Sequence, residues 1–160
     1  RAGLLITCWP LAISAVAPIA GRLIGRYPDG LLGGVGMALF AAGLWLLAAL
    51  PAQPADLDIA WRLALCGAGF ALFQSPNNHT IVTSAPLHRS GAASGMLGTA
   101  RLTGQTGGAV LLSALFSVWP PSNGTGEKVA LVVAGCLAVC AAFTSSRRVA
   151  HMPRGHRHGR

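Results

Sequence analysis

Three amide side chains beside a proline form the first group of residues that could act on a solute. Gln74, Asn77 and Asn78 stand at i, i+3 and i+4, so they share one face of a helix. Pro76 lies among them, and its ring predicts a kink that frees a backbone carbonyl one turn earlier. The amides could bond this carbonyl and hold helices together, or they could line a solute cavity with Phe70. Both interpretations turn this face toward the interior of the protein.

A second polar row contains an arginine. Ser94, Gly98, Arg101, Gln105 and Gly108 recur at helical spacing within an otherwise apolar stretch. Arginine at the centre of a bilayer costs at least ~2.5 to 3.5 kcal/mol, so Arg101 is expected to face a partner or a wet cavity unless it snorkels. All four acidic residues lie between the apolar stretches. The partner is therefore a carbonyl, an anionic ligand, a lipid phosphate or a residue outside this chain, and structural contact between helices remains the rival role.

Enzyme chemistry has no counterpart in the sequence. No nucleophile with a base, no pair of carboxylates and no histidine cluster lies within the apolar stretches, so we predict that the protein is not an enzyme. The glycines at 34–36 and 67–69 lack the third glycine of a dinucleotide fingerprint. The four cysteines form no Cys-x-x-Cys pair, and neither a metal site nor a cofactor is predicted.

Five long apolar stretches, separated by short polar connections, dominate the chain. Hydrophobic residues make up 52% and charged residues 10% of the 160 positions, which leaves too little polar surface for a soluble globule. Roughly 20 apolar residues of helix cross a bilayer core of about 30 Å. We therefore predict an all-α membrane protein, with a helical bundle over residues 1–146 and a basic cytoplasmic tail over residues 147–160. Its five transmembrane helices are expected at about 3–25, 30–50, 59–84, 89–118 and 128–146.

The distribution of basic residues predicts the orientation of the bundle. A net charge of +8 would suggest nucleic acid as the partner of a soluble domain. Here the basic residues fall mostly on one side, and Lys and Arg accumulate in cytoplasmic loops. The N-terminus is therefore expected outside and the C-terminus in the cytoplasm, with the lipid bilayer and no nucleic acid as partner. The inner side holds Arg22, Arg26, Arg89, Arg147, Arg148, Arg154, Arg157 and Arg160, and the outer side holds Arg1, Arg62 and Lys128.

Glycines recur within the apolar stretches at a spacing of four residues. Such pairs share one helix face and let another backbone approach, so close packing with some sliding is predicted there. The pairs are Gly21 and Gly25, Gly30 and Gly34, Gly91 and Gly95, and Gly104 and Gly108.

Three blocks of sequence carry a resemblance to a known family. They are Pro18 to Leu23 with Arg26 and Gly33 to Gly36, then Gly67 to Asn78, and then Ser84 to Thr106. At these residues the chain resembles the C-terminal half of a major facilitator superfamily transporter, of the fourteen-helix drug:proton antiporter branch. The resemblance implies that the five stretches are the last five helices of the fold. Because the chain also opens without an initiator Met, we expect it to be a piece of a longer protein.

The resemblance also implies a mechanism and its parts. Transporters of this family alternate access by rocking two six-helix halves about a site near the midplane. The family loop after the first stretch has an acid where this chain has Gly25; Arg26 is the retained basic member, and Asp29 is a candidate substitute for the acid. Since no carboxylate lies at membrane depth, the proton site is expected upstream.

We therefore predict part of a proton-coupled efflux transporter of a bacterial inner membrane, inactive as an isolated piece. Its partners are a small-molecule substrate and protons, both handled with the missing N-terminal part. The alternative is a membrane structural or interaction module that moves nothing. The residues predicted to line the substrate cavity are Gln74, Asn77, Asn78, Arg101 and Gln105. The residues predicted to act in gating or as hinges are Gly21, Arg26, Pro76, Gly104 and Gly108.

Overall fold

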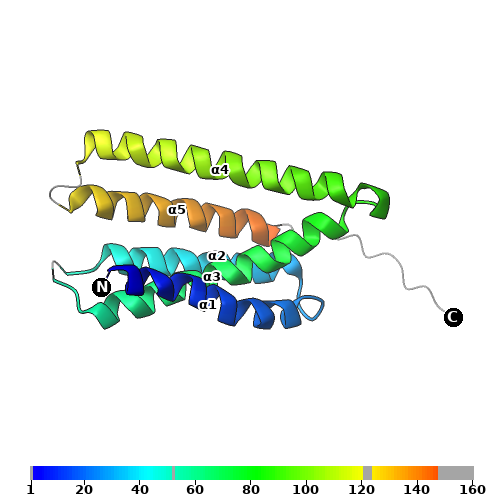
Figure 1. The fold of residues 1–160 in the computed structure, drawn as a ribbon, viewed down its shortest axis with the longest axis horizontal. Helices are drawn as coiled ribbons and strands as arrows, with labels where there is room; N and C mark the ends of the chain where they lie inside the picture. Colours follow the sequence, from blue (N-terminus) through cyan, green and yellow to red (C-terminus); the bar gives the residue numbers. More distant parts are fainter. Residues whose placement is uncertain (1, 52, 121–123, 148–160) are drawn as a thin grey trace.

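Five long helices contain most of the residues that the structure describes. The computed structural model describes residues 2–51, 53–120 and 124–147, and these contain no β-strand (Figure 1). The predicted all-α class with five helices is confirmed. The helices are α1 (Ala2–Leu23), α2 (Asp29–Ala48), α3 (Asp56–Thr83), α4 (Ser90–Val118) and α5 (Thr125–Arg147), with a short 3-10 turn η1 (Leu87–Arg89) before α4.

The helix ends follow local chemistry. α2 begins directly after Pro28 and carries Asp29 in its first turn, where a carboxylate interacts favourably with the positive end of the helix dipole. α3 begins at Asp56 rather than near residue 59, and Asp56 and Asp58 occupy its first turn for the same reason. Gly25 has a φ of +85° in the turn between α1 and α2, a conformation that glycine adopts without strain. The predicted basic tail lies outside the described residues, apart from Arg147 at the end of α5.

Three described segments are long and apolar enough to cross a membrane by length and composition: Leu5–Leu23, Asp29–Ala48 and Thr125–Arg147. α3 and α4 are longer, with 28 and 29 residues. At 1.5 Å per residue each measures roughly 40 Å, which exceeds the hydrocarbon thickness of a bilayer. Their lower apolarity has a local cause, because these two helices carry the amide row and the arginine row.

The backbones of α2 and α3 touch at two glycines. A Cβ atom added to Gly36 would lie 2.6 Å from the backbone nitrogen of Phe73 and 2.8 Å from the carbonyl oxygen of Gly69. One added to Gly69 would lie 2.5 Å from the backbone nitrogen of Phe40. Backbone atoms of a helix cannot move to accommodate a side chain, so any residue larger than glycine would clash at these two positions. We call this pair of residues, Gly36 and Gly69, the α2–α3 glycine contact.

The opposite side of α2 packs against α5. A Cβ atom added to Gly34 would lie 3.3 Å from the carbonyl oxygen of Ala142, and one added to Gly135 would overlap the ring of Trp45. The Ser145 hydroxyl donates a hydrogen bond of 3.3 Å to the carbonyl oxygen of Gly30. α2 is therefore the central helix, held between α3 and α5.

α1 completes this four-helix core on the other side of α3. Gly67 of α3 lies against the backbone carbonyl of Trp9. The rings of Trp9, Phe40 and Phe70 form one cluster with centroid distances of 5.9, 6.3 and 6.0 Å. Because the three rings come from α1, α2 and α3, the cluster ties these helices together.

The glycines that bring helices together are mostly not the pairs predicted from the spacing. Gly34 does lie in a close contact, but a Cβ atom added to Gly21, Gly25, Gly91, Gly95, Gly104 or Gly108 would meet no atom of another helix within 4 Å. The prediction of close packing at these six residues is wrong for the described chain. Four-residue spacing places two glycines on one face, but it does not say which face a neighbouring helix covers.

α4 differs from the other helices in burying none of its residues. It lies at the edge of the bundle beside α5 (Figure 1). It touches α5 near their connection, where Gly126 packs against Trp119 and Phe116. A narrow apolar crevice of about 230 Å³ separates the two helices further along, between residues such as Leu111 and Ala134.

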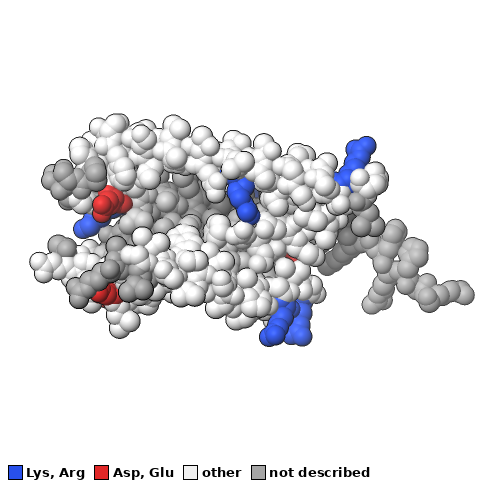
Figure 2. All heavy atoms as spheres, viewed as in Figure 1, with Lys and Arg blue, Asp and Glu red and all other residues white. Residues whose placement is uncertain are grey.

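Charged side chains collect at the two ends of the bundle. Arg22, Arg26, Arg89 and Arg147 lie at the end where α1 and α5 finish, whereas Asp56, Asp58 and Glu127 lie at the opposite end. Figure 2 shows most of the acidic atoms of this face gathered where α2 joins α3 and α4 joins α5. Apart from Arg101 in α4, the length between the two ends is largely uncharged, which is the pattern of a membrane-embedded surface.

The α2–α3 glycine contact gives the first testable prediction. Gly36→Ala in the full-length protein is expected to lower the thermal unfolding midpoint in detergent, because overpacking against backbone costs about 1 to 3 kcal/mol. Gly95→Ala is the matched control, since its Cβ would meet no atom within 4 Å, and it should leave the midpoint unchanged or slightly raised. Equal losses for the two variants would contradict the described packing.

The charge distribution gives a second prediction, on orientation. Gln53 and Ser84 are exposed residues at opposite ends of α3. In cells whose full-length protein has its native cysteines replaced, an impermeant thiol reagent is expected to label Gln53→Cys and to leave Ser84→Cys unlabelled until the cells are lysed. The reverse pattern would show that the basic end faces outward.

Candidate functional site

The amide row of α3 is half-buried and makes no side-chain hydrogen bond within the described chain. Gln74, Asn77 and Asn78 lie on one face, as their spacing predicts, and none of the hydrogen bonds between described residues involves their side chains. Pro76 beside them is almost fully buried. The amides therefore do not bond the carbonyl that the proline frees, and their donors and acceptors stay available for another molecule or another part of the protein.

Arg101 and Gln105 lie one turn apart on α4, and both are exposed. Neither side chain forms a hydrogen bond or an ion pair with a described residue. Among described residues the guanidinium thus has none of the partners that an arginine at membrane depth requires.

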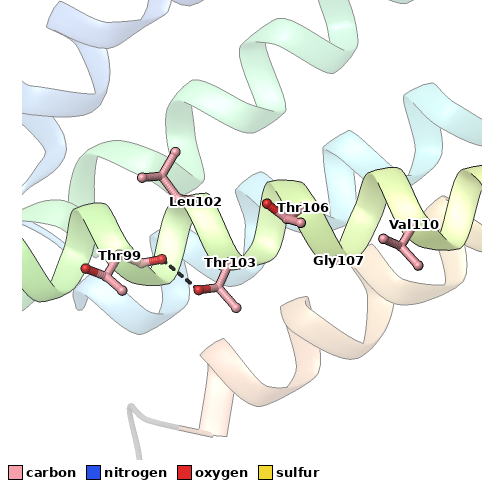
Figure 3. Close-up of a pocket in the computed structure, with 6 residues that line it drawn as sticks. All are labelled: Thr99, Leu102, Thr103, Thr106, Gly107 and Val110. Atoms are coloured by element: carbon pink, nitrogen blue, oxygen red, sulfur yellow. Dashed lines mark hydrogen bonds between the residues drawn. The ribbon is translucent and has the colours of Figure 1, made fainter.

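The opposite face of α4 carries a groove of about 550 Å³, and its lining includes three threonines (Figure 3). At 100° per residue, this face stands about half a turn away from Arg101. The Thr103 hydroxyl donates to the carbonyl of Thr99 at 3.0 Å, so that hydroxyl is satisfied within its own helix. The residues of the groove are Thr99, Leu102, Thr103, Thr106, Gly107 and Val110.

Within the described residues, no hydrogen bond joins the two predicted rows. The three amides share one face of α3, and Arg101 and Gln105 share one face of α4. A single cavity wall made of all five residues stays a prediction.

The predicted gating residues lie in different surroundings. Gly21, Gly104 and Gly108 are exposed, and nothing stands within 4 Å of a Cβ added to them. Pro76 is buried in α3. Arg26 is exposed and lines a hollow of about 430 Å³ at the basic end of the bundle. Their gating roles stay predictions.

A polar cluster in that hollow was not predicted as a site. Asp29 of α2 lies 3.3 Å from Nδ1 of His79 and accepts a hydrogen bond of 2.8 Å from the Thr80 hydroxyl, both on α3. The sequence offered one signal, because Asp29 was a candidate substitute for the family acid. His79 gave no signal, since its partner stands 50 residues away in the chain.

Comparison with known proteins supports the transporter interpretation. The chain is 57% identical over 147 residues, 92% of its length, to the uncharacterized transporter YebQ of Escherichia coli (strain K12). It is 31% identical over 117 residues, 73% of its length, to the multidrug resistance protein Stp of Mycobacterium tuberculosis. These matches are those expected for a piece of a major facilitator superfamily transporter. No family model and no solved structure matches it.

The predicted resemblance to drug antiporters of the major facilitator superfamily is thus confirmed. The matched regions span 32% of YebQ and 22% of Stp, so the chain corresponds to only part of the length of these relatives. Because the relatives are named as transporters, the family also supports the prediction of a protein that is not an enzyme and that functions in a membrane.

The free amides give a third prediction. Gln74→Leu in the full-length protein removes an amide of similar size without breaking a described hydrogen bond. It is therefore expected to keep the unfolding midpoint in detergent and to change which compounds the protein handles. Thr80→Val, which breaks the bond to Asp29, is the control and should lower the midpoint by the equivalent of about 1 kcal/mol. A large drop for Gln74→Leu would show that the amide holds helices together.

Proposed function

We propose that the chain forms part of a secondary active transporter that exports drugs or other small molecules across the bacterial inner membrane in exchange for protons. The observation that carries this proposal is the amide row of Gln74, Asn77 and Asn78. These groups are half-buried in a long helix of a transporter family and have no hydrogen-bond partner in the described chain.

Unpaired amides are costly in a lipid environment. A polar group in hydrocarbon must be bonded within the protein or stand beside water. Since no described residue bonds these amides, a wet cavity is the environment that accommodates them at least cost. A cavity of this kind would offer a substrate both hydrogen-bond donors and acceptors, together with the aromatic surface of nearby residues.

Arg101 and Gln105 would contribute to the same cavity from α4. The exposed, unpaired guanidinium supplies a fixed positive charge, which favours substrates with an anionic or strongly polar group. The absence of burial along α4 in the described chain leaves its Arg101 face free to meet the substrate or the remainder of the transporter.

Proton coupling would depend on parts of the transporter beyond the described helices. The four acidic residues, Asp29, Asp56, Asp58 and Glu127, all stand in the first turns of helices and not along their middles. A carboxylate that titrates at membrane depth must then come from elsewhere, as must the second half that rocks against this one. On this proposal the isolated chain is inactive in transport, and its N-terminus lies outside and its C-terminus in the cytoplasm.

One observation favours the alternative of a module that only organises other membrane helices. α4 buries no residue although it has 29 of them, as expected for a helix that docks on a partner. The two functions differ in what Arg101 does. As part of a cavity it acts on the substrate, whereas as a docking residue it supports assembly.

Arg101 therefore provides the fourth prediction. In an efflux-deficient strain that expresses the full-length protein, Arg101→Ala is expected to reduce drug resistance at least tenfold while protein abundance stays near normal, because the substitution removes a costly charge and keeps helix propensity. Arg101→Lys should restore part of the resistance if the guanidinium makes a forked contact.

Thr99→Val is the matched control, since Thr99 lies on the opposite face of α4, and it should retain resistance. If abundance falls in step with resistance, Arg101 serves assembly and the module is the better description. If Arg101→Ala keeps full resistance, the arginine has no part in transport.

A further inference from the structure

The cluster of Asp29, His79 and Thr80, here called the α2–α3 clamp, joins the start of one helix to the end of the next. His79 Nδ1 and Asp29 Oδ2 are 3.3 Å apart, the only contact at ion-pair distance between a basic and an acidic side chain within the described chain, and it becomes a full ion pair when His79 is protonated. The Thr80 hydroxyl reaches the same carboxylate oxygen at 2.8 Å. Two adjacent residues of α3 therefore hold one residue of α2.

The chemistry of the contact fixes where His79 can take up a proton. An ionised carboxylate only accepts hydrogen bonds, so Nδ1 must carry a hydrogen to bond Asp29. The free ring nitrogen of a neutral His79 is then Nε2. The side chain of His79 is 48% exposed, against 19% for Asp29. A proton from water can therefore add at Nε2 without breaking the bond to Asp29.

Water reaches the clamp through the hollow at the basic end of the bundle. The hollow is lined by residues of the α1–α2 turn together with Asp29 and His79. Within the described residues, only Asp29 lies within ion-pair distance of His79. The other charged or titratable side chains at this end are Arg22 of α1, Arg26 and Tyr27 of the turn, His88 and Arg89 of η1, and Arg147 of α5.

The clamp also borders the proline-containing turn of α3. The Thr80 hydroxyl lies 2.9 Å from the carbonyl oxygen of Pro76 and 2.8 Å from Asp29. A hydroxyl has one hydrogen, so these two acceptors compete for it. A change in the hydrogen bonding of Asp29 therefore alters the hydrogen bond between Thr80 and the carbonyl of Pro76, one turn away beside the amide row.

We propose that the α2–α3 clamp is a proton-binding site that senses the pH of the compartment at the basic end. Addition of a proton to Nε2 converts the neutral imidazole to an imidazolium and turns its hydrogen bond with Asp29 into a full ion pair. The start of α2 is then held more tightly to the end of α3. The proposal rests on the proposed transport function only for its consequence, namely that pH biases the shape of the cavity wall.

The size and direction of the effect follow from the exposure of the pair. Histidine is the side chain whose charge ordinarily changes between pH 5 and 8. A partly exposed ion pair changes a conformational ratio by about fivefold at most, because water and salt screen it. Acidification should therefore raise the ratio of the shorter to the longer α2–α3 separation two- to fivefold.

A distance measurement between α2 and α3 tests the fifth prediction without requiring transport. Leu31 and Val82 are 47% and 37% exposed and flank the clamp on the two helices. Spin labels at Leu31→Cys and Val82→Cys, in the full-length protein with its native cysteines replaced, report the separation in lipid nanodiscs. Between about pH 8 and about pH 5.5, the ratio of the short-distance to the long-distance population is expected to grow two- to fivefold.

His79→Gln keeps a hydrogen-bonding side chain but does not titrate, and it should abolish the pH response; Asp29→Asn should do the same. His88→Gln is the matched control, because His88 stands at the same end without contacting Asp29, and its response should equal that of the unmodified protein. The proposal would be overturned if the α2–α3 separation did not change with pH in the unmodified protein. It would also be overturned if the pH response remained in His79→Gln.

Drug resistance measured on the same variants separates the two proposals. A pH-dependent distance that requires His79 supports the clamp even if the protein confers no resistance. Resistance that depends on Arg101 supports the transport function even if the distance between α2 and α3 does not change with pH.

Discussion

The contact between the backbones of α2 and α3 is the constraint on which the rest of the structure depends. Between helices in lipid there is no hydrophobic driving force, so association relies on close packing at small residues. Gly36 and Gly69 supply it, with each Cβ position already filled by backbone of the facing helix. This contact fixes the register of α3 against α2, and that register brings His79 to Asp29 and orients the amide row.

The hydroxyls and the amides of these helices differ in whether they find a hydrogen-bond partner. Thr7, Ser14, Thr99, Thr103 and Thr144 each donate to a backbone carbonyl four residues earlier, so they are satisfied within their own helix. The amides of α3 have no such partner within the described chain. This difference explains why the threonine-lined groove is a weaker candidate for chemistry than the amide row.

α4 shows the same distinction at the level of a whole helix. It is rich in glycine and small polar residues, a composition suited to close packing, yet none of its residues is buried within the described chain. By contrast, glycines of α2, α3 and α5 lie in close contacts between helices. The two proposed functions therefore differ mainly over what meets the exposed face of α4, a substrate cavity or only other protein helices.

The sequence by itself determined the all-α class, the five helices, the family and the row of amides on one face of α3. These features depend on apolar length and on residues three or four positions apart, which share local geometry. It misassigned most close-packing glycines, because spacing does not tell which face a neighbour covers. Only the tertiary structure decided that Gly36 meets Gly69, that Asp29 meets His79 and that no residue of α4 is buried within the described chain. Each of these depends on how one helix is rotated against another, and that rotation is set by contacts between residues far apart in the chain.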